Sequence, residues 1–195
     1  MDRAFRTALC SLIFNAVYGA YNVLFGVLSR SYWLFTVGVY YAILGAVRFA
    51  VLRSGKAGRS VARGTGVMLL LLVLPLVGTV VLSVVESRGL ELHLIVMLVM
   101  AMYAFTKVTL ATVNLVKLRK SRLPRLVALK NISLADALVS MFSLQRSMLV
   151  SFEGMTAAEI GIMNIATGSA VCVAVLLLGM NLVSLKRGLF KNIKQ

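Results

Sequence analysis

Six apolar stretches, each about 20 residues or longer, divide this chain of 195 residues. One helical crossing of a bilayer needs about 20 consecutive apolar residues, so each stretch is long enough to span a membrane. A soluble domain could not bury this much apolar surface: 60% of the residues are hydrophobic and 14% are charged, against roughly 25% charged in an average soluble domain. The sequence therefore excludes a soluble enzyme, a secreted disulfide scaffold and a disordered protein.

The predicted fold is an all-α polytopic membrane protein with six transmembrane helices in a single domain, residues 1–195. The predicted spans are 8–28, 33–53, 65–85, 93–117, 125–150 and 157–185. Pro75 lies near the centre of the third span and predicts a kink, because proline removes a helical N–H. The first span follows two arginines, as in a signal peptide, but no convincing cleavage site interrupts it, so a retained helix is expected. Thr156 and Glu159 have the spacing of a capping box before the sixth span.

The net charge of +15 comes from 21 Lys and Arg against 6 Asp and Glu. In a soluble protein this excess would indicate nucleic acid, but here the basic residues gather in alternate segments, at 53–63, 117–125 and 186–194. The intervening segments 86–91 and 153–159 carry four glutamates and one arginine. The positive-inside rule then places both termini in the cytoplasm. The expected partners are anionic lipid headgroups at the basic rim, with no nucleic acid.

One short match predicts that the halves 1–88 and 89–195 are an inverted repeat. The pattern N-x6-S-R begins at Asn22 and again at Asn114, near the ends of the first and fourth spans. Three spans in each half give the halves opposite orientations, which is a common plan of transporters.

Charged and polar side chains inside the predicted spans suggest a functional site, since a charge in hydrocarbon costs about 2.5–3.5 kcal/mol on insertion scales. Lys107 lies about 21 Å from the outer end of its span, and Asp136 lies about 16 Å from the inner end of the next. The two are therefore expected at matching depth, where they can form an ion pair. Arg48, about 7 Å from the inner end of its span, either joins them or extends to the cytoplasm. The predicted solute-binding residues are Asn22, Tyr41, Arg48, Lys107, Asn114, Asp136, Ser140 and Ser143.

The sequence leaves other interpretations of these residues open. Small and polar stripes also let membrane helices pack closely. Ser133 and Asp136 fit a capping box, in which the fifth helix would begin at Leu134 and Asp136 would lie near water. A helix break at 130–133, lining a site, is a third version.

Little in the sequence supports catalysis. The single histidine, His93, is expected at an outer helix end, and no hydrolase, metalloprotease or phosphate-loop motif is present. No cluster has metal-ligand spacing, so neither a metal nor a cofactor is expected. Cys10 and Cys172 lie in apolar stretches and are expected to be packing residues. The enzyme question stays open, with no residue set that proposes a chemistry.

Several strings resemble a family of small six-helix membrane proteins from Gram-positive bacteria. They are FNAVYGAYNVLFG, SRSYW, YYAILGAVRF, SMFSLQ and NIATGSAVC. The resemblance covers most of the chain. It implies a bacterial cytoplasmic membrane and no particular activity, substrate or site residue.

Two functions follow as hypotheses. The first is a small transporter or channel with a polar midplane site for a small anionic or zwitterionic solute, because Lys107 and Arg48 outnumber Asp136; Asp136 would carry a coupling proton. The second is a non-transporting subunit that binds lipid or a partner protein. A ligand-sized cavity touching Lys107 would favour the first, and a dry core with a groove open sideways to lipid would favour the second. A homodimer is one arrangement that so short a chain permits.

Overall fold

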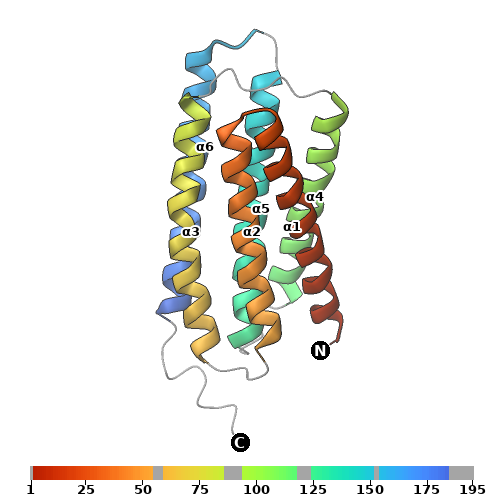
Figure 1. The fold of residues 1–195 in the computed structure, drawn as a ribbon. Helices are drawn as coiled ribbons and strands as arrows, with labels where there is room; N and C mark the ends of the chain where they lie inside the picture. Colours follow the sequence, from red (N-terminus) through yellow and green to blue (C-terminus); the bar gives the residue numbers. More distant parts are fainter. Residues whose placement is uncertain (1, 55–58, 86–93, 118–123, 152–153, 185–195) are drawn as a thin grey trace, which may run out of the picture.

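The computed structural model describes residues 2–54, 59–85, 94–117, 124–151 and 154–184. These residues form six helices (Figure 1). They are α1 (Asp2–Leu28), α2 (Tyr32–Arg53), α3 (Arg59–Val85), α4 (Leu94–Lys117), α5 (Pro124–Ser151) and α6 (Ala157–Val183). The predicted all-α, six-helix membrane architecture is confirmed.

The described helices have the length and surface that a bilayer requires. Five of them, α1, α2, α3, α5 and α6, are long and apolar enough to cross a membrane, and α4 contributes the apolar segment Met100–Val116. Large hydrophobic side chains such as Val17, Leu74 and Ile162 face outward. Successive helices run in opposite directions, so α1 begins and α6 ends at the same end of the bundle (Figure 1).

The helix bounds differ from the predicted ones mainly at two starts. Both α1 and α3 begin six residues earlier than predicted, because a helix can continue past the hydrocarbon into a polar segment, where arginine is a good helix former. The helix α5 is continuous from Pro124 to Ser151. A start at Leu134 and a break at 130–133 were therefore both wrong, and Asp136 lies well inside the helix.

Two local predictions concern α3 and α6. The helix α3 continues without interruption through Pro75, and the kink expected there stays a prediction. At the start of α6, Glu159 N donates to Thr156 Oγ1 at 3.3 Å, and Thr156 N donates to Glu159 Oε2 at 2.8 Å. The predicted capping box is confirmed.

The helices pack most closely in the pairs α1/α2, α3/α6 and α4/α5. Glycines allow the close approach: a Cβ added at Gly26 of α1 would lie 2.6 Å from Phe35 N of α2. A Cβ at Gly66 of α3 would lie 2.9 Å from Gly179 O of α6. Small residues at such contacts are how helices gain packing in lipid. The pair α1/α4 is not among the closely packed pairs, and this leaves room for a groove.

Basic residues gather at the end of the bundle where α1 begins. Arg53 and Arg63 are exposed there, and α4 ends at Lys117. Most of the other predicted loop and tail charges, and His93, lie outside the described residues, in 55–58, 86–93, 118–123, 152–153 and 185–195. The described part of this end agrees with the positive-inside pattern, and its assignment to the cytoplasm stays a prediction.

Candidate functional site

Asp136 of α5 lies between two cations in the interior of the bundle. Its Oδ2 is 2.7 Å from Lys107 Nζ of α4 and 3.2 Å from Arg48 Nη2 of α2. The side chains of Asp136 and Arg48 are 1% exposed and that of Lys107 is 3% exposed. The predicted pairing of Lys107 with Asp136 is therefore present, and the site is shared by three helices. We call Arg48, Lys107 and Asp136 the charge cluster.

The direction of helical side chains explains how Arg48 reaches this cluster. Its Cα lies near the C-terminal end of α2, five residues before Arg53. Side chains on a helix lean toward its N-terminus, so the long guanidinium stem points back toward the middle of the bundle. The alternative in which Arg48 extends to the cytoplasm is therefore wrong. Asp136 is on α5, which runs opposite to α2 (Figure 1), so the two side chains lean toward each other.

The helix α1 completes the cluster with neutral polar partners. Lys107 Nζ donates to Ser11 Oγ at 3.2 Å and also to Asn15 Oδ1. Arg48 donates through Nη1 to Ser11 Oγ and through Nη2 to Ser133 Oγ of α5, the latter at 3.4 Å. Four helices thus hold the three charges, and removal of any one partner would leave a buried polar group unsatisfied.

Tyrosine rings form one wall of the cluster. Lys107 Nζ lies 5.1 Å from the centroid of the Tyr103 ring, a cation–π distance. Tyr103 stacks on Tyr18 at 4.0 Å, and Tyr18 meets Tyr41 edge-on at 5.1 Å. Tyr103 also donates a hydrogen bond to Asn15 Oδ1 at 3.2 Å. The rings tie α1, α2 and α4 together around the ammonium group.

The charge cluster has a surplus of positive charge and free hydrogen-bonding atoms. Two cations share one carboxylate, so one positive charge has no acidic partner within the cluster. Among the described residues, Asp136 Oδ1, Arg48 Nε and Asn15 Nδ2 have no hydrogen-bond partner. The cluster and the adjacent Asn15 therefore offer one acceptor for an ammonium group and two donors for an anion.

A groove of about 730 Å³ lies between α1 and α4, beside the cluster. Its lining includes Phe14, Val17, Tyr18, Met102, Tyr103 and Lys107. Val17 and Met102 also belong to the outward-facing surface, since they are 64% and 66% exposed. The groove is thus ligand-sized and touches Lys107, as the transporter hypothesis expects, and it opens sideways, as the lipid-binding hypothesis expects.

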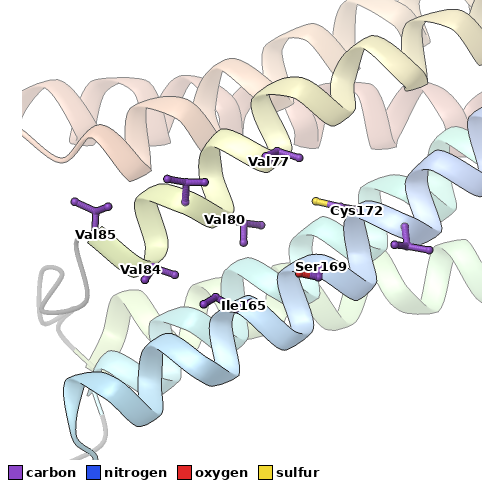
Figure 2. Close-up of a pocket in the computed structure, with 9 residues that line it drawn as sticks. Val77, Val80, Val84, Val85, Ile165, Ser169 and Cys172 are labelled. Atoms are coloured by element: carbon purple, nitrogen blue, oxygen red, sulfur yellow. The ribbon is translucent and has the colours of Figure 1, made fainter.

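A second groove, of about 500 Å³, lies between α3 and α6 (Figure 2). Val77 and Val80 of α3 and Ile165 and Cys172 of α6 line it, and Figure 2 shows these side chains on the two neighbouring helices. Its lining residues carry no charge. It differs chemically from the groove at Lys107, because a ligand with an apolar chain and a charged end would find no ionic contact in it.

Two more of the predicted site residues lie directly beside the cluster. Tyr41 Oη and Ser140 Oγ are 2.9 Å apart, and Ser140 Oγ donates to the backbone carbonyl of Asp136 at 2.7 Å. Five of the eight predicted residues therefore come together: Tyr41, Arg48, Lys107, Asp136 and Ser140. Whether they bind a solute stays a prediction.

The other three predicted residues lie apart from the charges. Asn22 is buried but donates to Tyr18 O of its own helix at 2.7 Å. Ser143 is buried one helical turn beyond Ser140, and its hydroxyl has no hydrogen-bond partner among the described residues. Asn114 is half-buried near the end of α4. Within the described residues, none of these three forms a hydrogen bond or ion pair with the charge cluster.

Sequence reasoning gave no site role to Ser11, Asn15, Trp33 or Arg146. Ser11 and Asn15 are one turn apart on α1, and this i, i+4 spacing of polar residues was the available signal. Arg146 is 4% exposed, and its guanidinium lies 4.1 Å from the centroid of the Trp33 ring. An arginine in an apolar span is itself a signal that was overlooked.

Within the described residues, no group of three His, Cys, Asp or Glu could hold a metal ion. No family model, no curated protein and no solved structure matches this chain. The resemblance to small six-helix proteins of Gram-positive bacteria therefore stays a prediction.

Proposed function

We propose that this protein is a small membrane transporter or channel, and that its charge cluster binds the charged group of an anionic or zwitterionic solute. The observation that carries the proposal is one buried carboxylate shared by two buried cations, Lys107 at 2.7 Å and Arg48 at 3.2 Å. Such groups are expensive to place in hydrocarbon and usually mark a substrate or ion pathway.

The free atoms of the cluster support this solute class. A carboxylate or phosphate would exchange with Asp136 as the partner of Lys107 and Arg48, and it would relieve the surplus positive charge. The unpartnered Arg48 Nε and Asn15 Nδ2 would donate to it. The ammonium group of a zwitterion would bind the unpartnered Asp136 Oδ1. A cation without an acidic group would meet two like charges and is the disfavoured solute.

The starts of the first two helices of each half support an inverted repeat, which is part of the proposal. The start of α4 follows that of α1 by 92 residues, and the start of α5 follows that of α2 by the same number. This shift also relates Asn22 to Asn114, the two sites of the sequence match. Because successive helices alternate in direction, halves related by such a shift have opposite orientations, as in many transporters.

The same shift of 92 residues exchanges hydrogen-bonded pairs with one another. The shift takes Tyr41 to Ser133 and Ser140 back to Arg48, so the Tyr41–Ser140 pair becomes the Ser133–Arg48 pair. It takes Ser11 to Tyr103 and Lys107 back to Asn15, so the Ser11–Lys107 pair becomes the Tyr103–Asn15 pair. The first two pairs connect α2 to α5 and the other two connect α1 to α4, which is the exchange that a pseudo-twofold axis between the halves would produce. Such an axis would pass near the charge cluster, and repeat interfaces of this kind bind their substrates at that position.

The same proposal places the protein in a bacterial cytoplasmic membrane with both termini in the cytoplasm. The basic end of the bundle, with Arg53 and Arg63 exposed, would contact anionic headgroups there. A homodimer would fit the size of the chain.

A second candidate function is a non-transporting, lipid-binding subunit. The observation that favours it is the sideways opening of the α1/α4 groove, whose Val17 and Met102 are among the outward-facing residues. A transport measurement separates the two candidates.

The test is uptake of radiolabelled acetate, glutamate, phosphate and glycine by proteoliposomes that contain the full chain. We expect uptake of at least one probe, reduced by about tenfold or more in Lys107→Ala, because loss of one partner of a buried charge costs several kcal/mol. Lys130→Ala is the matched control, since Lys130 is a half-buried lysine of α5 outside the cluster. No uptake of any of these four probes by folded wild-type protein would reject transport of small solutes of this class and would favour the lipid-binding subunit.

A further inference from the structure

The α1/α4 groove combines an apolar wall with a buried ammonium group. Phe14 and Val17 of α1 and Met102 of α4 provide apolar surface, and Lys107 lies in the same lining. The volume of about 730 Å³ is within the range of about 300–1,000 Å³ that is typical of small-molecule sites. The groove therefore fits one extended apolar chain with a charged end.

The polar end of the groove favours an anionic headgroup. Lys107 belongs to a cluster with one surplus positive charge. Asn15, which accepts a hydrogen bond from Lys107 Nζ, is fully buried and leaves its Nδ2 donor without a partner among the described residues. A carboxylate at this point would accept hydrogen bonds from both the ammonium and the amide, and both bonds are charge-assisted because the acceptor is ionised.

We infer that the groove between α1 and α4 binds a long-chain alkyl carboxylate, with its chain against Phe14, Val17 and Met102 and its carboxylate at Lys107 and Asn15. The ligand enters sideways from the bilayer, between two helices that do not pack closely. This inference rests on the proposed function and specifies the solute of the same cluster as an amphipathic anion.

The test uses palmitate with a photoreactive diazirine on its chain, added to the full-length protein in phosphatidylcholine nanodiscs. Mass spectrometry then maps the labelled residues. We expect labelling of α1 and α4 at the groove, abolished by excess palmitate and reduced at most about twofold by excess hexadecanol, which lacks the charge. Lys107→Met should remove this selectivity, because the chain contacts remain and the ionic contact is lost.

Two matched variants locate the site. Val17→Trp fills the α1/α4 groove and should lower palmitate-competed labelling by about tenfold or more. Val173→Trp fills the apolar α3/α6 groove of Figure 2 and should leave it unchanged. Both positions face outward, 64% and 54% exposed, so neither change disturbs the core. Elution of each variant as a single symmetric peak on size exclusion checks that it is folded.

The outcomes separate this inference from the proposed function. Equal competition by hexadecanol, or equal competed labelling at both grooves, would overturn the inference, since any apolar chain would then suffice. Absence of competed labelling in a protein that takes up acetate or glutamate would overturn it and leave the proposed function standing. Absence of both would reject the two together.

Discussion

At the scale of the residue, Asp136 decides whether two buried cations can coexist. Replacing it by asparagine keeps the shape of the side chain but leaves Lys107 and Arg48 without a counter-charge. Breaking a buried ion pair in this way costs about 3–5 kcal/mol, so we expect Asp136→Asn to lower the free energy of unfolding by this amount. Equilibrium unfolding in mixed detergent and SDS micelles measures it.

The double variant Lys107→Met/Asp136→Asn is the control for this prediction. It restores the cluster to one surplus positive charge, so it should unfold at a higher SDS fraction than Asp136→Asn alone. Coupling between the two changes is expected because the groups are in contact. If Asp136→Asn were as stable as the wild type, the three charges would not form the cluster described above.

Arg48 contributes its shape as well as its charge. Its guanidinium reaches Ser11, Ser133 and Asp136 through two nitrogens, whereas a lysine is a shorter point charge that cannot bridge them. We expect Arg48→Lys to lower the free energy of unfolding by about 1–3 kcal/mol, the value of hydrogen bonds to a charged group. Arg53→Lys, at the exposed end of the same helix, should have no measurable effect. Equal stability of the two variants in the same unfolding assay would contradict this role.

At the scale of the element, the contact between α1 and α2 depends on a glycine. A Cβ at Gly26 would lie 2.6 Å from the backbone nitrogen of Phe35, and backbone cannot move aside as a flexible side chain can. We expect Gly26→Ala to destabilise the bundle by about 1–3 kcal/mol, the usual cost of overpacking. Thermal unfolding followed by circular dichroism measures the change.

Gly78 of α3 provides the matched comparison for Gly26. No atom lies within 4 Å of a Cβ added there, so Gly78→Ala should leave the stability unchanged or raise it by up to about 1 kcal/mol, because alanine is the better helix former. A neutral or stabilising Gly26→Ala, with a stabilising Gly78→Ala, would show that helix propensity, and not the close approach, controls this bundle.

The sequence alone predicts the helices well because their length is set by the bilayer. It also predicts the pairing of Lys107 with Asp136, since helical rise converts residue numbers into depth. Local patterns were less informative: Ser133 and Asp136 have capping-box spacing, yet their partners are Arg48 and Lys107 on other helices. The contacts with charged residues of other helices, and not the local spacing, therefore determine the role of Asp136.

Other features of the site depend on helix adjacency and orientation, which a single sequence does not contain. The role of Asn15 follows from the position of α1 against α4. Asn22, on the same polar face of α1, bonds instead to its own helix, and no sequence signal separates the two. The α1/α4 groove likewise arises from a helix pair that does not pack closely, which hydropathy cannot reveal.

At the scale of the whole molecule, the charge distribution predicts one orientation in the membrane. Ser29 lies at the end of the bundle where α1 finishes, and Ser54 caps α2 at the basic end. In a background with Cys10→Ala and Cys172→Ala, we expect Ser29→Cys to react with a membrane-impermeant maleimide on intact cells. Ser54→Cys should react only after the membrane is permeabilised. The reverse pattern would place the basic end of the bundle outside the cell. Equal labelling of the two cysteines on intact cells would indicate that the protein inserts in both orientations.

Buried residues of α5 flank Asp136 on both sides, which constrains how a transporter of this shape would work. Ser143 and Leu129 lie seven residues on either side of Asp136 along α5, about 10 Å away in each direction, and are only 1% and 7% exposed. We call the packing around Ser143 the outer layer and the packing around Leu129 the inner layer. A solute could reach Asp136 from water only if one of these two layers opens. Related halves of opposite orientation would open them in turn.

Single cysteines in the same cysteine-free background test this alternation. We expect Ser143→Cys to react with a charged methanethiosulfonate only from the outer side and Leu129→Cys only from the inner side. Addition of a probe that the wild type transports should raise one rate and lower the other, because a population shift toward one open state depletes the other. Rates that rise together would identify a channel, in which both layers open at once. Two unreactive cysteines would mean that neither layer opens, and the charge cluster would then hold the bundle together without passing a solute.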